Sequence, residues 1–175
     1  VEARGEGAEG LQYSLRPMDE ALADAAGGSR MIALAFGALM AMAFAALLIS
    51  FILPDRLFIL YFTLFSLQAL YIAFLSGQGF DWPLLRAALP LQAHAWNVPA
   101  AFSGAAACLF VRDIADLRRY SPRVYRVFGW LALAFVVLAF ANFARQFGFG
   151  TVVAAIGNVM FLGTAVFTLV VAFLA

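Results

Sequence analysis

The sequence has few of the residues from which most catalytic and metal sites are built. It contains one histidine and one cysteine, and its 11 basic residues are all arginine, so lysine is absent. Such a set cannot supply a zinc cluster or a bis-histidine haem site. The sequence also has no phosphate-binding glycine loop and no nucleophile elbow. We therefore expect no enzyme active site in this chain, and the sequence predicts no cofactor and no metal site.

Charge is scarce as well. Only 12% of the 175 residues are charged and 65% are hydrophobic, whereas soluble domains have roughly 25% charged and about 45–50% apolar residues. None of the acidic residues lies inside a long apolar run. Because intramembrane charges normally mark ion and proton pathways, their absence disfavours an ion-coupled carrier. The composition predicts a membrane protein whose first partner is the lipid bilayer, and nucleic acid is not an expected partner.

The uncharged runs are long enough to cross a bilayer, which needs about 20 apolar residues. They predict an all-α membrane protein, a polytopic bundle of five transmembrane helices at about residues 31–53, 57–75, 93–111, 127–144 and 151–175. Residues 1–30 are predicted to form an extracytoplasmic tail, and residues 31–175 the transmembrane module. Within the tail, the stretch MDEALADAA predicts a short helix that leads into the membrane.

Arginine is distributed unevenly between the predicted loops. If the N-terminus lies outside, the external loops hold only Arg86 and Arg145, and the cytoplasmic loops hold Arg56, Arg112, Arg118, Arg119, Arg123 and Arg126. The positive-inside rule favours this orientation. The alanine-rich, lysine-free composition is typical of a GC-rich bacterial gene. We therefore expect a multi-pass protein of the bacterial inner membrane with its N-terminus outside.

Carboxamides are the main polar side chains of the predicted spans. In the N-out topology Gln68, Asn97, Asn142 and Asn158 all lie in the outer half of the membrane, and Tyr71 shares a helical stripe with Gln68. One interpretation is that these amides form hydrogen bonds between helices, each contributing about 0.6 kcal/mol and at most about 2. The other is that they line an outward-facing pocket for a small extracytoplasmic ligand.

The segment SGQGFDWPLLRAALPLQAHAWNVP joins the second and third spans and carries the only histidine. Tryptophan suits the headgroup region of a bilayer, and glycine and proline interrupt helices, so the segment is predicted to form an external cap. We interpret His94 as an interfacial side chain in preference to a ligand-binding one. The candidate ligand-binding residues are Gln68, Tyr71, His94, Trp96, Asn97, Asn142 and Asn158.

Small residues recur at a spacing of four on two spans. They are Gly37, Ala41 and Ala45 on the first span, and Ala100, Gly104 and Cys108 on the third. Such faces allow two helices to approach closely. The main prediction is packing within the bundle, and a homodimer is the alternative.

Two stretches carry a resemblance to a known family. LYFTLFSLQALYIAFLSGQGFDWP and FVRDIADLRRYSPRVYRVFGWLALAF resemble the membrane region of the bacterial seven-transmembrane receptors with diverse intracellular signalling modules, over residues 31–175. In that family one span ends in a glycine and aromatic turn that leads to Trp-Pro, which is matched by Gly77, Gly79, Phe80, Trp82 and Pro83. The next span ends in an aromatic and basic run before a proline turn, matched by Phe110, Arg112, Arg118, Arg119 and Pro122.

The resemblance implies a sensor domain before the first span, seven spans, and a cytoplasmic output domain such as a histidine kinase or diguanylate cyclase after the last. The five predicted spans would be an incomplete seven-helix module that couples an extracytoplasmic signal to that output. In this hypothesis Arg112, Arg118, Arg119 and Pro122 form the cytoplasmic coupling loop, in which each arginine gains about 1 kcal/mol from the anionic inner leaflet. A structural or accessory subunit of a membrane complex is the alternative, and a small-solute carrier is less favoured.

Overall fold

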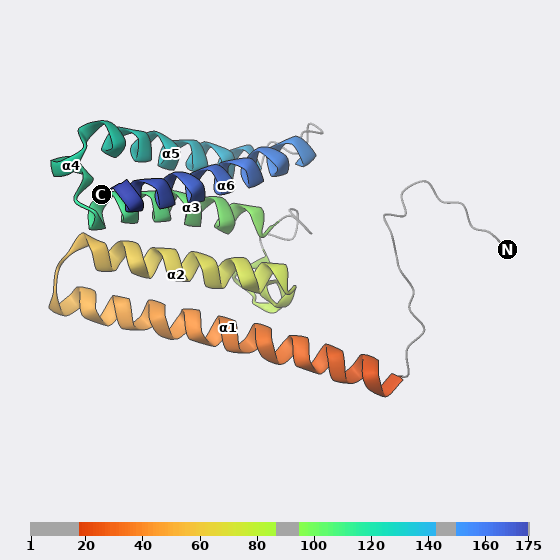
Figure 1. The fold of residues 1–175 in the computed structure, drawn as a ribbon. Helices are drawn as coiled ribbons and strands as arrows, with labels where there is room; N and C mark the ends of the chain where they lie inside the picture. The colour runs from red at the N-terminus through yellow and green to blue at the C-terminus, as the bar shows by residue number, and fades with distance from the viewer. Residues whose placement is uncertain (1–17, 87–94, 143–149, 175) are drawn as a thin grey trace.

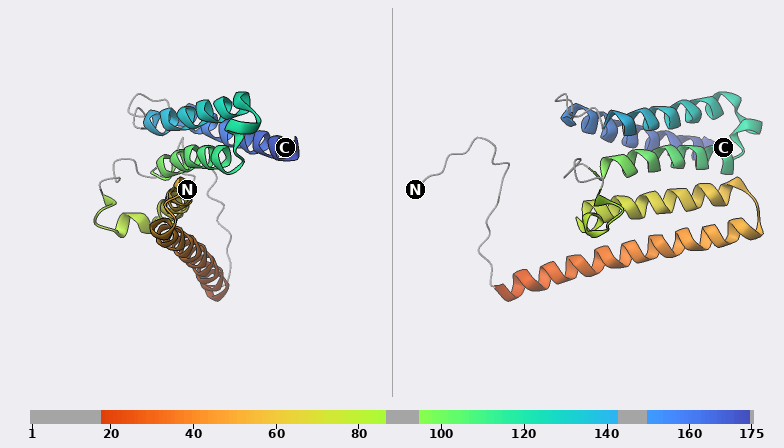
Figure 2. Two further views of the ribbon diagram at one scale, coloured as in Figure 1. Left: turned by 90° about the vertical axis from the view of Figure 1, so that its left-hand side faces the viewer. Right: turned by 180° about the vertical axis from the view of Figure 1, so that it is seen from behind.

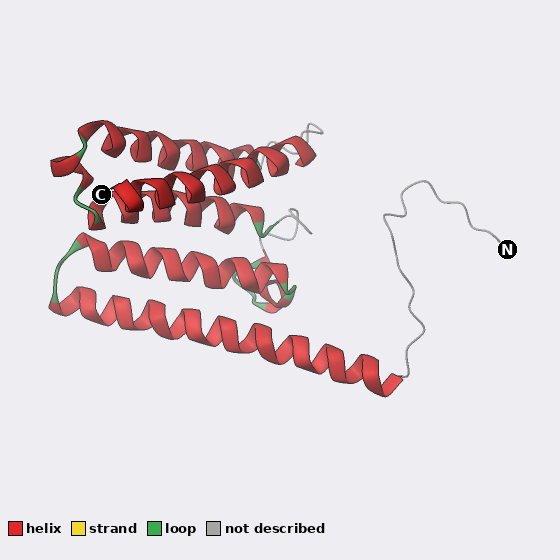
Figure 3. Ribbon diagram, in the orientation of Figure 1, coloured by secondary structure: helices red, strands yellow, loops and turns green. Residues whose placement is uncertain are grey.

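The computed structural model describes residues 18–86, 95–142 and 150–174, which contain six α-helices and one short 3-10 helix and form no strand (Figures 1 and 3). In chain order these are α1 (Met18–Ile52), α2 (Arg56–Leu75), η1 (Gln78–Asp81), α3 (Asn97–Ile114), α4 (Leu117–Tyr120), α5 (Pro122–Ala141) and α6 (Gly150–Leu174). The prediction of an all-helical chain is confirmed for the described residues.

Four segments are long and apolar enough to cross a membrane: Gly27–Ile52 of α1, Arg56–Leu75 of α2, Pro122–Ala141 of α5 and Ala155–Phe173 of α6. They correspond to four of the five predicted spans. The third predicted span corresponds to α3, which is not among the four. Its 18 residues include Asn97 and Pro99 at one end and Arg112 and Asp113 at the other, so its composition alone does not mark it as a span.

The ends of the helices follow from local chemistry. Asp55 caps the N-terminus of α2, where its carboxylate accepts a hydrogen bond from the Leu57 amide at 2.9 Å. Pro122 occupies the first turn of α5, where its missing N–H costs no hydrogen bond. The predicted helix of MDEALADAA is present, but it is continuous with the first span, because no proline separates the two and the helix tolerates Gly27 and Gly28.

The helices pack mostly as sequential antiparallel neighbours. Helix α1 packs mainly on α2, α2 on α3, and α3 on α5, while α6 lies against both α3 and α5. Figure 2 shows α1 diverging from the other helices toward its N-terminal end. The α1–α2 connection, the α3–α5 turn and the C-terminus of α6 lie at one end of the bundle, and η1 lies at the other (Figure 1).

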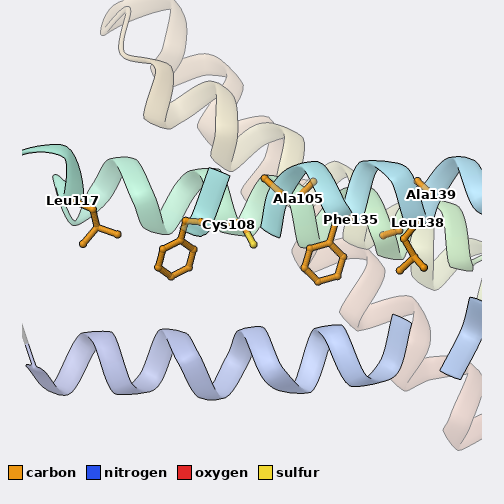
Figure 4. Close-up of a cluster of buried hydrophobic side chains, with 9 residues drawn as sticks. Ala105, Cys108, Leu117, Phe135, Leu138 and Ala139 are labelled. Carbon is orange, nitrogen blue, oxygen red and sulfur yellow. The ribbon is translucent and has the colours of Figure 1, made fainter. Parts of the chain in front are cut away.

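The core lies between α3 and α5 (Figure 4). Phe128 and Phe135 are fully buried there, and they pack with small residues of α3, among them Ala105 and Cys108. A Cβ on Gly104 would lie 2.8 Å from the ring of Phe135 and 3.0 Å from the ring of Phe161. The small face of α3 therefore packs inside the bundle as predicted.

The small face predicted on the first span does not pack in this way. A Cβ on Gly37 would meet nothing within 4 Å, and Ala41 and Ala45 are exposed. Helix α1 instead buries Ala43 and Ala46. Within the described part of the chain the packing prediction for this face is wrong, because α1 turns a neighbouring face toward α2.

Candidate functional site

Four of the predicted ligand-binding residues line one cavity of about 410 Å³ near the η1 end of the bundle. Gln68 and Tyr71 come from α2, Trp96 immediately precedes α3, and Asn158 comes from α6. The rest of its lining is Leu39, Ile72, Ala100, Ser103 and Phe161. We call this space the outer cavity. Residues that lie far apart in the sequence, from Leu39 to Phe161, thus face a common space.

The geometry of α2 and α3 explains how these side chains meet. Gln68 and Tyr71 are three residues apart and so share one face of α2. The ring of Tyr71 packs edge-on against Trp96, with ring centroids 5.9 Å apart and an angle of 77°, which is a favourable aromatic arrangement. Ser103 donates its hydroxyl hydrogen bond to the Ala100 carbonyl of its own helix at 2.7 Å. The amides, the phenol and the indole are therefore the groups that give this cavity its polarity.

In the part of the chain that the structure describes, the amides make no direct hydrogen bond between helices, which the first interpretation requires. Among the described residues, the side-chain hydrogen bonds all join positions at most four apart in the chain. Even the buried Asn142 donates from Nδ2 to the Leu138 carbonyl of its own segment, at 2.9 Å. This arrangement favours the pocket over the packing interpretation.

A second cavity of about 30 Å³ adjoins the first and is lined by Asn97, Asn142 and Asn158 together with Trp96. Asn142 is only 3% exposed. Its Oδ1 and the Nδ2 of Asn97 are buried with no hydrogen-bond partner in the described part of the protein. About 10–15 Å³ is enough to hold one water molecule, so this cavity has room for a water that accepts from Asn97 and donates to Asn142. The two asparagines thus form a small polar chamber beside the outer cavity.

A third cavity of about 530 Å³ continues from the outer cavity and lies along α2, α3 and α6. The two cavities share Gln68, Ser103 and Phe161 as lining residues. We call this third cavity the inner cavity. The rest of its lining is Leu64, Gly104, Ala107, Val111, Phe135, Thr164, Ala165, Thr168 and Leu169. Sequence reasoning missed it because apolar residues on a membrane helix do not reveal whether they face lipid or a cavity. Thr164 and Thr168, one turn apart, were the one available polar signal.

A fourth cavity of about 290 Å³ lies at the opposite end of the bundle, and Arg56, Arg112, Asp113, Arg118 and Tyr125 are among its lining residues. Arg112 Nε lies 3.1 Å from Asp113 Oδ1, and its guanidinium carbon lies 4.5 Å from the centre of the Tyr125 ring. The contact with Tyr125 joins the end of α3 to the start of α5, and the contact with Asp113 lies within α3. Two of the predicted coupling residues, Arg112 and Arg118, therefore share this site.

The turn between α3 and α5 differs from the sequence prediction. The sequence beyond the third span predicts that its helix continues through Ile114 and Leu117 until Pro122 interrupts it. Helix α3 instead ends at Ile114, and Asp116 has a left-handed conformation with φ 44°, which aspartate tolerates better than most residues. Arg119 is exposed on the short helix α4, outside the fourth cavity. The helix therefore breaks before Arg118 and Arg119, which lie on the separate short helix α4.

A family model described as "7TM diverse intracellular signalling" matches residues 30–175. The chain belongs to this family. Together with the four apolar helices, this membership makes it a multi-pass membrane protein, and the family description suggests a membrane sensory module. Neither the curated proteins nor the solved structures provide a match.

In this 7TM diverse intracellular signalling protein, the residues that match the family motif form a turn. They do not line the outer cavity. Gly77 ends α2 with φ 80°, and a Cβ on Gly79 would lie 3.0 Å from Phe74. Phe80 packs on Phe74 with centroids 5.3 Å apart. Trp82 packs edge-on against Phe36 of α1 at 5.9 Å, and Pro83 follows it in an exposed position. The turn thus fastens the η1 segment to α1 and α2, and His94 lies outside the described residues.

Proposed function

We propose that the chain is the transmembrane sensory module of a bacterial receptor and that the outer cavity is its ligand-binding site. The observation that carries this proposal is the convergence of Gln68, Tyr71, Trp96 and Asn158 on one space. A cavity of 410 Å³ lies within the range of ordinary small-molecule sites, about 300–1,000 Å³. Its amides offer both donors and acceptors, which suits a small polar ligand.

In this proposal α3 is a fifth span of an inner-membrane module whose N-terminus lies outside. Its 18 residues extend about 27 Å, close to the roughly 30 Å of a hydrocarbon core. Helix α3 packs against α2, α5 and α6, and it carries more buried residues than any of these three, including Ser103 and Gly104. A helix surrounded by protein needs less apolar surface than one that faces lipid, which accounts for its composition.

The proposed signal passes from the outer cavity to the α3–α5 turn and on to a cytoplasmic output domain, and residues 1–30 belong to the extracytoplasmic side. Helix α6 is the element best suited to move, since Gly157 is its only buried residue among those described. A ligand can shift such an equilibrium only by its different affinity for the two helix arrangements. The proposal assigns no catalysis to this module.

Thermal unfolding of the purified chain tests the ligand site. Small uncharged polar compounds that bind the folded chain raise its melting temperature, and the rise grows with the logarithm of ligand concentration divided by Kd. We expect Gln68→Leu and Asn158→Leu to lose this stabilisation and the exposed Gln78→Leu, a matched carboxamide control, to retain it. Stabilisation that survives in both cavity variants would overturn the assignment of the site.

The second candidate function is that of a structural or accessory subunit of a membrane complex. The exposed stripe of Gly37, Ala41 and Ala45 on α1 favours it, because small residues allow a helix of another chain to approach closely. Replacing Ala41 with Phe should then release the partner chain from the purified complex. Retention of all co-purifying chains would leave the sensory module as the better account.

A further inference from the structure

The polar chamber lies where the start of α3 meets the end of α5, at the η1 end of the bundle (Figure 1). Asn97 is the first residue of α3, and Asn142 is the C-cap of α5. Leu138 of α5 and Val153 and Gly157 of α6 also line the chamber. It is therefore formed among three helices of the described chain, and at about 30 Å³ it is far too small to hold another helix.

The side-chain amide of Asn142 is held in one orientation. Its Nδ2 donates to the Leu138 carbonyl at 2.9 Å. Turning the amide over would place Oδ1 against that carbonyl, and two acceptors cannot form a hydrogen bond. Oδ1 must therefore point elsewhere, and it is buried without a hydrogen-bond partner in the described part of the protein. Because Asn142 is only 3% exposed, bulk solvent does not satisfy this oxygen.

Asn97 brings the complementary group to the same chamber. Its Nδ2 is also buried without a hydrogen-bond partner among the described residues. The chamber thus combines an unpaired donor from α3 with an unpaired acceptor from α5, and these two groups do not bond to each other directly. Leaving both unpaired would cost the desolvation of each. An occupant that accepts from one amide and donates to the other removes both costs.

Size and polarity together identify this occupant. About 10–15 Å³ holds one water molecule, so a chamber of about 30 Å³ has room for one water and at most a second. The hydrogens of Asn97 Nδ2 repel a cation, and the Asn142 oxygen repels an anion. Buried waters make about three hydrogen bonds, and the amide of Asn158 is a third polar group in the lining.

We propose that the chamber is a binding site for one ordered water molecule that links α3 to α5. The water accepts a hydrogen bond from Asn97 Nδ2 and donates one to Asn142 Oδ1, and its second hydrogen is left for the amide oxygen of Asn158. The interhelical interpretation then holds for Asn97 and Asn142, through water. These two residues join helices and do not contact ligand, so this inference is independent of the proposed ligand site.

A crystal structure of the full chain in a lipidic mesophase, at a resolution that shows ordered waters, tests the site directly. We expect a single spherical density peak within hydrogen-bonding distance of both Asn97 Nδ2 and Asn142 Oδ1. The peak should persist in Gln68→Leu, whatever that variant does to ligand binding, and disappear in Asn142→Leu. A direct Asn97–Asn142 hydrogen bond would overturn the inference, as would a metal ion, a ligand group or another side chain in the chamber.

A double-mutant cycle in mixed micelles tests the link energetically. Asn97→Leu and Asn142→Leu should each lower the folding equilibrium constant about five- to 150-fold, because each leaves the other amide unpaired. The double variant removes both polar groups, so its loss should be far smaller than the product of the two single losses.

Ser103 provides the matched control for this cycle. It lies on α3 outside the chamber, and its hydroxyl donates to its own helix. The losses of Ser103→Ala and Asn142→Leu should therefore multiply in the combined variant. If the losses of Asn97→Leu and Asn142→Leu multiply in the same way, no water joins the two amides and the inference is wrong.

Discussion

Gly104 allows α5 and α6 to approach α3, and its replacement by alanine should separate them. The added Cβ would lie 2.8 Å from two ring carbons of Phe135 and 3.0 Å from one of Phe161. Phe135 is fully buried and borders the inner cavity, so its ring can move away from the added Cβ only by a change of rotamer and of its packing. Overpacking of this kind costs about 1–3 kcal/mol. Alanine also favours the helix over glycine by about 1 kcal/mol, so the net loss of unfolding free energy should be about 0–2 kcal/mol.

Gly163 provides the matched control for this substitution. It lies in α6, and a Cβ there would meet nothing within 4 Å, so Gly163→Ala gains the helix preference without the clash. The two variants should therefore differ by about 1–3 kcal/mol. Equilibrium unfolding in mixed micelles measures both, and Phe135→Leu combined with Gly104→Ala should restore part of the loss. Equal stabilities of the two alanine variants would refute this account of the packing.

Three further predictions concern topology, the cap turn and coupling. A cysteine at Gly79 should react with a membrane-impermeant maleimide from outside, and one at Ser121 only after permeabilisation; the reverse pattern would contradict the N-out orientation. Gly77→Ala should cost about 1–2 kcal/mol of unfolding free energy, because its φ of 80° is left-handed; an unchanged melting temperature would argue against that conformation. Replacing Arg118 and Arg119 with glutamine should change basal output in the full-length receptor, and ligand affinity only by the same coupling factor. Unchanged output per molecule would remove the coupling role.

The sequence predicted the helices best where charge or proline marks their ends. Helix α2 lies within one residue of its predicted start because Pro54 and Asp55 separate it from α1. The first span and the short helix of MDEALADAA were predicted as separate helices, and α1 joins the two, because hydropathy shows where a membrane begins and not where a helix begins. The left-handed Asp116 was not predictable, since aspartate adopts that conformation only in particular tertiary settings.

The sequence predicted how deep in the membrane the site residues lie, but not which of them line the same cavity. Counting along the spans placed the carboxamides in one half of the membrane, and the outer cavity does bring Gln68 and Asn158 together. Asn97 and Asn142 lie in the separate small chamber instead, because the rotation of each helix about its axis depends on packing between helices. The sequence did not reveal the inner cavity for the same reason, although Thr164 and Thr168 of its lining were one polar signal.

The central claim is that the outer cavity binds the ligand whose signal the module transmits. It is tested most directly by ligand-dependent output per receptor molecule in full-length Gln68→Leu, with membrane abundance measured alongside. Loss of one buried hydrogen-bonding partner costs about 1–3 kcal/mol, so the account predicts a roughly five- to 150-fold weaker response, while the exposed Gln78→Leu responds normally. An unchanged response per molecule in Gln68→Leu would contradict the account.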